Sequence, residues 1–175
     1  MSSETPETAT SLSSQHSPPD SGELHEALKH HFGYEKFKPL QEEVIRHSMS
    51  GKDAVLLLPT GGGKSVCYQL PAVITGGLTL VVSPLISLMQ DQVQSLRQNG
   101  ITAAFLNSSM TGAEEQEVYR SMEGGELRLL YAAPERVLRE DFLTALTSAG
   151  LDRIAIDEAH CVSSWGIVSA RCTAA

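Results

Sequence analysis

Hydrophobic and polar positions change their period several times along the chain, and each change marks a predicted element. Apolar residues recur at helical spacing over residues 24–32 and again over 40–49, which predicts two short amphipathic helices. Continuous apolar runs at 54–57 and 78–82 instead indicate strands, and the second is typical of a strand buried on both faces.

The rest of the chain alternates strands with helices. Further strands are predicted at residues 102–106, 127–132 and 153–156. Helical patterns lie at 85–96, 111–123 and 134–149. Thr111 and Glu114 have the spacing of a capping box, which fixes where the second of these helices begins. Strands and helices that alternate through short connections predict an α/β fold, with a mostly parallel sheet flanked by helices on both faces.

Composition refines the domain boundaries. Residues 1–21 are rich in Ser, Thr, Pro and Glu and have few apolar side chains, so we expect a disordered tail. The chain of 175 residues is long enough for one substantial core, which we place in residues 22–166. The formal net charge of -8 argues against a basic protein that coats nucleic acid, although it leaves room for a local basic groove.

Location and metal content are also constrained. No apolar run approaches the roughly 20 residues that span a bilayer, and the N-terminus lacks the features of a signal peptide. We therefore expect an intracellular protein without a membrane partner, cytoplasmic if bacterial and nuclear if eukaryotic. The three cysteines are too few and too scattered for a disulfide framework or a four-ligand zinc site.

The first candidate for chemistry is a glycine-rich loop between the apolar run at 54–57 and a segment that can form a helix. Its residues are Thr60, Gly61, Gly62, Gly63, Lys64 and Ser65. Consecutive glycines let backbone N–H groups face an anion, Lys64 adds positive charge for the outer phosphates, and Ser65 offers a hydroxyl to Mg²⁺. Leu58 occupies the position where the strict motif has its first glycine, so a merely flexible turn is the alternative.

The second candidate is Asp157-Glu158-Ala159-His160, which follows the last predicted strand. Asp157 is suited to hold Mg²⁺ through its water shell, and Glu158 to orient and deprotonate an attacking water molecule. The alternative is a solvated acidic turn, which Asp-Glu alone favours. Together with the glycine loop, in this order along the chain, the pair indicates a nucleoside triphosphatase.

Several segments, in this order, resemble the first motor domain of the RecQ family of helicases. They are residues 32–41, 59–65, 67–71, 82–92, 131–136 and 157–166. The resemblance covers about residues 24–166 and implies a RecA-like domain of a superfamily 2 DNA helicase. Such an enzyme uses ATP and Mg²⁺, with Lys64 and Glu158 as catalytic residues. It moves 3′ to 5′ on single-stranded or partly duplex DNA, in repair and recombination.

The same resemblance implies roles for residues before the loop and for DNA contacts. Gln41 would read the adenine edge and Tyr34 would stack near the base, while Lys38 stands where the family usually has Arg. Residues 83–92 and 107–108 fall at segments that touch the DNA backbone in the family. From the residues alone, Gln41 is equally well a surface residue, and 107–109 is more simply a turn before a helix.

The resemblance ends after Gly166, because residues 167–175 diverge from the family pattern. It implies a C-terminally incomplete sheet, with a gap beside the strand that leads into the glycine loop. Three hypotheses follow: part of a DNA helicase, an inactive truncated product that binds nucleotide or a partner without catalysis, and, more weakly, a P-loop kinase. The oligomeric state is not determined by the sequence.

Overall fold

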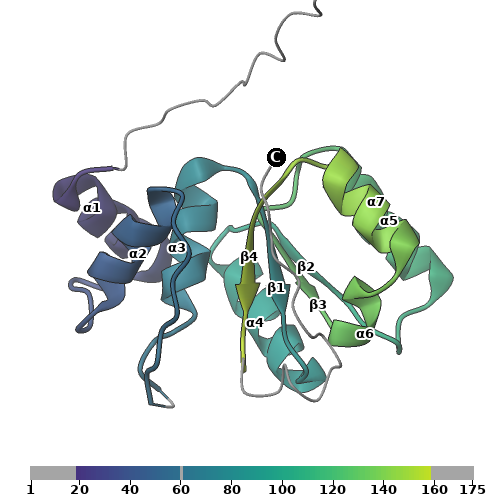
Figure 1. Cartoon of the computed structure of the whole chain (residues 1–175), viewed down its shortest axis with the longest axis horizontal. Helices are drawn as coiled ribbons and strands as arrows, with labels where there is room; N and C mark the ends of the chain where they lie inside the picture. Colours follow the sequence, from purple (N-terminus) through teal and green to yellow (C-terminus); the bar gives the residue numbers. More distant parts are fainter. Residues whose placement is uncertain (1–18, 60, 159–175) are drawn as a thin grey trace, which may run out of the picture.

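The computed structural model describes residues 19–59 and 61–158 (Figure 1). The helices are α1 (Ser21–Phe32), α2 (Gln41–Met49), α3 (Val66–Thr75), α4 (Ile86–Gln98), α5 (Gly112–Glu123), α6 (Pro134–Val137) and α7 (Glu140–Ser148). The strands are β1 (Leu78–Val82), β2 (Ala103–Leu106), β3 (Leu129–Ala132) and β4 (Leu151–Ile156). Among the described residues no helix is long and apolar enough to cross a membrane.

The four strands form one parallel sheet in the order β2-β3-β1-β4. The register places Leu80 of β1 between Leu130 of β3 and Ile154 of β4. This confirms the predicted parallel sheet. Because parallel strands end at the same edge, the residues that follow them are brought together there, as in other open α/β sheets that bind ligands.

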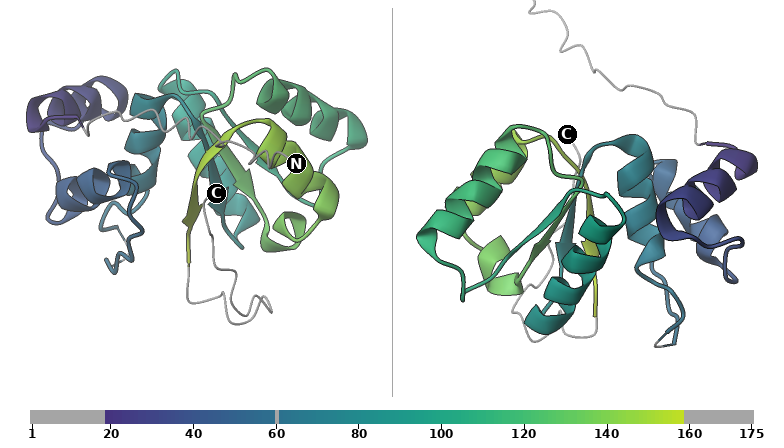
Figure 2. Two further views of the ribbon diagram at one scale, coloured as in Figure 1. Left: turned by 45° about the horizontal axis from the view of Figure 1, so that its top comes forward. Right: turned by 180° about the vertical axis from the view of Figure 1, so that it is seen from behind.

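Helices cover both faces of the sheet, as predicted (Figure 2). On one face, α3 and α4 pack on β1, β2 and β3 through a buried cluster that includes Ala72, Met89, Val93 and Tyr131. On the other face, α5 and α7 pack through a second cluster built around Phe142. Burial of these apolar faces is the main favourable contribution to the stability of such layers.

The N-terminal helices form a small layer outside α3. Leu24, Leu28 and Ile45 are fully buried against α3, which joins α1 and α2 to the rest of the domain. Helix α1 begins with a capping box, in which Asp20 accepts from the backbone N–H of Glu23 and the Glu23 side chain accepts in return. Ser21, which the composition places in the tail, therefore belongs to this helix.

The predicted strand at 54–57 is wrong. None of the four strands in the described sheet includes these residues, and the side chains of Val55 and Leu57 are 89% and 88% exposed. Figure 1 shows the segment as an extended chain alongside α3. An apolar run becomes a strand only where a neighbouring strand satisfies its backbone N–H and C=O groups, and β4 pairs with β1 alone among the described strands.

Candidate functional site

The glycine loop has a backbone that only glycine adopts easily. Gly61 and Gly63 have φ of 80° and 81°, in the left-handed region. A Cβ on Gly62 would lie 2.8 Å from the Pro59 carbonyl oxygen, so no side chain fits there. The result is an uncluttered loop that leads directly into α3. Thr60, the first residue predicted to bind nucleotide, lies outside the described residues.

Two side chains at the start of α2 hold this loop in place. The Lys38 Nζ donates to the carbonyl oxygen of Gly61 (2.7 Å), and the Gln41 Nε2 donates to that of Gly63 (2.9 Å). The Gln41 Oε1 accepts from the backbone N–H of Lys38 (2.8 Å), which fixes the orientation of the amide. Gln41 is only 4% exposed, so the alternative that it is a surface residue is wrong. Its contacts are with the loop, and adenine recognition stays a prediction.

A pocket of about 620 Å³ opens beside Gln41. It is lined by Phe37, Lys38, Pro39, Leu40, Glu42, Glu43 and Arg46. Tyr34, predicted to stack near the base, is 55% exposed and does not line this pocket. Phe37 is the aromatic side chain that lines the pocket. It lies in the segment 32–41 that resembles the family, but the apolar periodicity alone does not identify it as a site residue.

Lys64 and Ser65 stand at the N-terminal end of α3. Lys64 forms no ion pair with any residue that the structure describes, so its ammonium group is available to a phosphate. Ser65 takes the N-cap position of α3, but its hydroxyl makes no capping hydrogen bond. A helix N-terminus with free N–H groups and an adjacent cation favours an anion. The loop, a lysine without an ion pair among the described residues, and a serine at the start of the helix therefore fit a nucleotide phosphate.

Asp157 and Glu158 lie directly after β4, at the edge where the parallel strands end. The backbone N–H of Asp157 donates to the Val82 carbonyl oxygen (2.9 Å), so pairing with β1 continues to this residue. The Asp157 Oδ1 accepts from the backbone N–H of Glu158 (3.0 Å), and Glu158 has φ of 55°. A side chain in the left-handed region is uncommon and is often found at functional turns. Ala159 and His160 lie outside the described residues.

Asp157 also acts electrostatically on the first turn of α3. Burial raises the pKa of Tyr68, and the nearby Tyr131 and the carboxylate of Asp157 raise it further. Burial likewise raises the pKa of Tyr131 to about 12, with Asp157 acting in the same direction. The carboxylate is thus within electrostatic reach of Tyr68, three residues beyond Ser65. No group of three or more His, Cys, Asp or Glu side chains within the described part of the chain could hold a metal ion.

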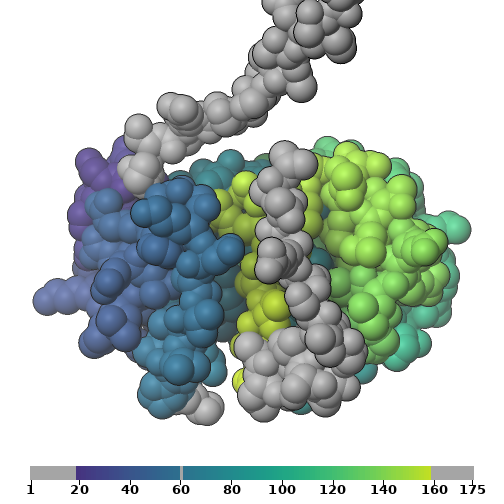
Figure 3. Space-filling view, in the orientation of Figure 1, coloured from purple at the N-terminus to yellow at the C-terminus, as the bar shows by residue number. Residues whose placement is uncertain are grey.

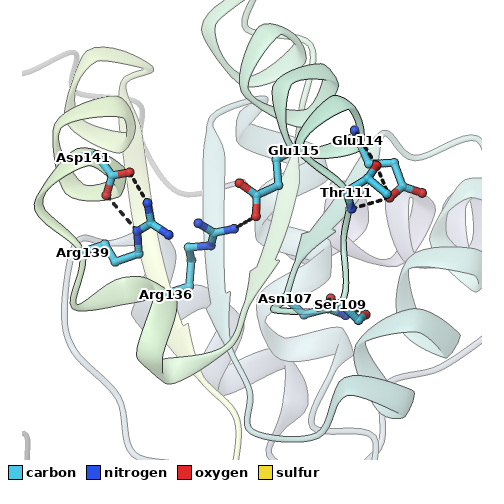
Figure 4. Close-up of polar contacts among 8 residues, drawn as sticks. All are labelled: Asn107, Ser109, Thr111, Glu114, Glu115, Arg136, Arg139 and Asp141. Atoms are coloured by element: carbon cyan, nitrogen blue, oxygen red, sulfur yellow. Dashed lines mark hydrogen bonds and ion pairs between the residues drawn. The ribbon is translucent and has the colours of Figure 1, made fainter.

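The two segments predicted to contact DNA, 83–92 and 107–108, directly follow β1 and β2. Figure 4 shows Asn107 folded over Ser109, whose backbone N–H and hydroxyl donate to the Asn107 Oδ1 at 2.9 and 2.8 Å. Asn107 is 1% exposed, so its side chain forms the turn and is not open to solvent, as the simpler alternative holds. Ser108 is exposed. Ser83, at the end of β1, is buried, and α4 begins three residues later.

A partly buried ion pair lies near this edge and is not predicted by the sequence. Arg136 of α6 donates to the Glu115 carboxylate of α5, and Arg136 is 6% exposed (Figure 4). The pair joins the end of β3 to the helix that follows β2. Arg136 belongs to one of the resembling segments, but its partner could not be found, because the two residues are brought together only by the fold.

Comparisons with known proteins place the chain among helicases. The family model described as DEAD/DEAH box helicase matches residues 38–171. An ATP-dependent DNA helicase RecQ of Haemophilus influenzae is 52% identical over 139 residues, which are 79% of this chain and 22% of the relative. An ATP-dependent DNA helicase Q1 of Pongo abelii is 44% identical over 155 residues, 85% of this chain and 24% of the relative. The chain thus spans about a quarter of the length of these relatives.

The fold has a match among solved structures. The crystal structure of a hypothetical ATP-dependent RNA helicase from Sulfolobus tokodaii has a TM-score of 0.65 and 23% sequence identity. The match covers 84% of this chain and 44% of the other, and it bears out the RecA-like α/β architecture expected from the resemblance.

Proposed function

Because the chain belongs to the DEAD/DEAH box helicase family, we propose that it forms the ATP-binding motor segment of a RecQ-type DNA helicase that moves 3′ to 5′. The observation that supports this best is the clamp of Lys38 and Gln41 on the glycine loop, next to a cation without an ion pair in the described chain. The Haemophilus influenzae relative named ATP-dependent DNA helicase RecQ is 52% identical to it, and the Pongo abelii relative named ATP-dependent DNA helicase Q1 is 44% identical. In such an enzyme, ATP supplies the phosphoryl group whose transfer to water releases free energy.

Each residue of the site has a role in this proposal. The loop N–H groups and Lys64 bind the outer phosphates, and the clamp keeps the loop open when no ligand is bound. Phe37, Lys38 and the pocket beside them receive the base, with Tyr34 and Gln41 as further base contacts. Glu158 accepts the proton of the attacking water. The Asp157 carboxylate holds Glu158 in place by accepting a hydrogen bond from the Glu158 backbone N–H.

Mg²⁺ binding is proposed for Ser65 and Asp157. Mg²⁺ prefers oxygen ligands, keeps several waters and is usually held by one or two protein groups together with phosphates. A serine hydroxyl and one carboxylate match that habit. Since the described residues contain no larger acidic or histidine cluster, the phosphates of the nucleotide would complete the coordination.

The proposed nucleic-acid partner is single-stranded or partly duplex DNA. Ser108 follows β2 and the N-terminal part of α4 follows β1, so both lie at the edge of the sheet where Asp157 and Glu158 follow β4. Hydroxyl groups and backbone N–H groups at such positions bind phosphates without reading sequence. An intracellular location, nuclear or cytoplasmic, remains a proposal from the sequence, and fractionation of cells that express the protein tests it.

The experiment is ATP hydrolysis by the purified chain with and without single-stranded DNA. DNA-stimulated hydrolysis is expected, with Glu158→Gln lowering the rate by about 10²-fold or more while binding persists. Lys64→Ala is expected to weaken nucleotide binding itself. Gln94→Ala, an exposed position on α4, is the matched control. Hydrolysis at the buffer rate by the unaltered chain would contradict catalysis by this chain.

A second candidate function is nucleotide binding without hydrolysis. It is favoured by the exposure of Val55 and Leu57, because the segment that leads into the loop is not anchored in the described sheet. Catalysis depends on placing groups to within a fraction of an ångström, and a loop without that anchor is free to shift. Binding of ATP that Lys64→Ala abolishes, together with no hydrolysis, would select this candidate.

A further inference from the structure

Gln69 lies in α3, one turn after the glycine loop, and joins three elements that are distant in sequence. It is on α3, and its backbone N–H donates to the carbonyl oxygen of Ser65, one turn earlier (2.9 Å). Its Nε2 donates to the Oε1 of Gln92 on α4 (2.8 Å) and to the hydroxyl of Tyr131 on β3 (2.9 Å). One amide group therefore ties the first turn after the loop to a second helix and to the sheet.

The surroundings of this amide are buried and polar. Gln69 is 5% exposed and Tyr131 is 1% exposed, so neither side chain reaches a ligand from solvent. The Tyr68 hydroxyl is also buried, and it lies near the hydroxyls of Ser65 and Tyr131. Asp157 influences both tyrosines electrostatically. The space between a sheet and its helices is usually filled with apolar side chains. Burying the Gln69 amide there costs free energy unless its hydrogen bonds are made.

The geometry points to Gln69 as a positioning residue that couples nucleotide binding at the glycine loop to DNA binding at α4, by holding α3, α4 and β3 in one arrangement. This inference rests on the proposed function, because it needs both ligands. A purely structural amide would be satisfied by any two neighbours. Gln69 instead links the helix that begins at the phosphate site with the helix whose N-terminal part is the proposed DNA contact.

Gln69 can hold these elements in one arrangement because its hydrogen bonds to Gln92 and Tyr131 are directional and act only over a short range. Apolar packing would tolerate a small movement of α4 along α3. The same movement would break the hydrogen bond from Gln69 to Gln92. Leaving the buried amide unpaired then costs free energy, so arrangements in which α4 and the first turn of α3 keep their relative position are favoured. Two sites whose ligands favour the same arrangement of such an element are coupled, and the coupling is reciprocal.

The test measures this coupling in the purified chain. The affinity for a fluorescent, non-hydrolysable ATP analogue with Mg²⁺ is measured with and without saturating oligothymidylate. We expect DNA to change that affinity by about fivefold or more in the unaltered chain. In Gln69→Met and Tyr131→Phe, the factor should fall toward one, while each ligand alone keeps its affinity within about twofold, as expected when only coupling is lost.

Two controls separate coupling from stability. Gln94→Met makes the same change at an exposed position on α4, and Val118→Ala removes buried methyl groups on the opposite face of the sheet. Both should keep the factor of the unaltered chain. An unchanged factor in folded Gln69→Met, a factor of one in the unaltered chain, or loss of coupling in Val118→Ala would each overturn the inference alone. Failure of the unaltered chain to bind the analogue would overturn the proposed function as well.

Discussion

Two apolar runs of similar composition have opposite surroundings in this molecule. Strand β1 is buried at all five positions between β3 and β4, whereas Val55 and Leu57 of the 54–57 segment are almost fully exposed. The space-filling view in Figure 3 shows this blue segment at the surface beside the sheet. Both runs consist mainly of aliphatic residues, so the difference lies in whether neighbouring strands are available.

The comparison shows how burial of a strand depends on partners far away in sequence. β1 has its partners in residues 129–132 and 151–156, and all three strands are in the described sheet. The 54–57 segment packs partly through Leu56 on the α1–α3 layer but has no strand beside it among the described residues. The glycine loop consequently depends on Lys38 and Gln41, and on α3, for its position.

The largest effect that sharpens this comparison is expected in β1. Leu80→Ala removes a side chain that is 1% exposed and leaves a cavity between the sheet and the layer of α5 and α7. The free energy of unfolding should fall by about 2–5 kcal/mol, as is usual for buried leucines. Urea unfolding followed by circular dichroism measures it. A loss below about 1 kcal/mol, small for any buried leucine, would show that the sheet is not packed as described.

The next effect concerns the loop itself. Gly63→Ala places a Cβ 2.4 Å from the Gln41 Nε2, at a φ of 81° that also strains alanine. Gly51→Ala is a matched control, because Gly51 has φ of 75° but nothing within 4 Å of the added Cβ. Both variants should lose about 1–2 kcal/mol of stability from the left-handed backbone.

Only Gly63→Ala should also weaken ATP binding, because the clamp from Gln41 must move. Titration with a fluorescent ATP analogue gives the affinity of both variants. Equal affinities for Gly63→Ala and Gly51→Ala would show that the clamp does not shape the phosphate site.

A smaller effect is expected where structure is determined locally, at the start of α5. The Thr111 side chain caps the backbone N–H of Glu114, and hydrogen bonds from Thr111 lower the pKa of the Glu114 carboxyl from its ordinary value of 4.5. A carboxyl whose pKa is lower in the folded state adds stability above the unfolded pKa and loses it as the pH falls through the folded pKa.

Thr111→Ala should therefore cost about 1 kcal/mol at neutral pH. The stability of Glu114→Gln should depend less on pH below 4.5 than that of the unaltered chain. Thermal unfolding at a series of pH values measures both. The same pH dependence in Glu114→Gln and in the unaltered chain would show that this carboxyl does not contribute.

The smallest effect is expected in the exposed run. Leu57→Ala makes the same chemical change as Leu80→Ala at a side chain that is 88% exposed. The free energy of unfolding should change by less than about 0.5 kcal/mol, as for other surface substitutions. Urea unfolding of the two variants side by side makes the comparison. A loss as large as that of Leu80→Ala would mean that the 54–57 segment is buried in solution.

The sequence determined the features that depend on near neighbours. The capping box at Thr111, the helices and the strands of the described sheet follow from apolar period and from short-range hydrogen bonds, and the structure confirms them. The glycine loop was also evident from the sequence, because consecutive glycines before Lys64-Ser65 allow the left-handed backbone that the structure shows at Gly61 and Gly63.

Only the tertiary structure decided which groups meet across long separations. Gln69 contacts Tyr131, 62 residues away, and Arg136 pairs with Glu115 from another helix. No periodicity encodes such contacts, since they depend on how layers pack. The same reason explains the wrong strand at 54–57: its apolar pattern was correct, but a strand exists only with a partner, and the fold alone shows whether one lies beside it.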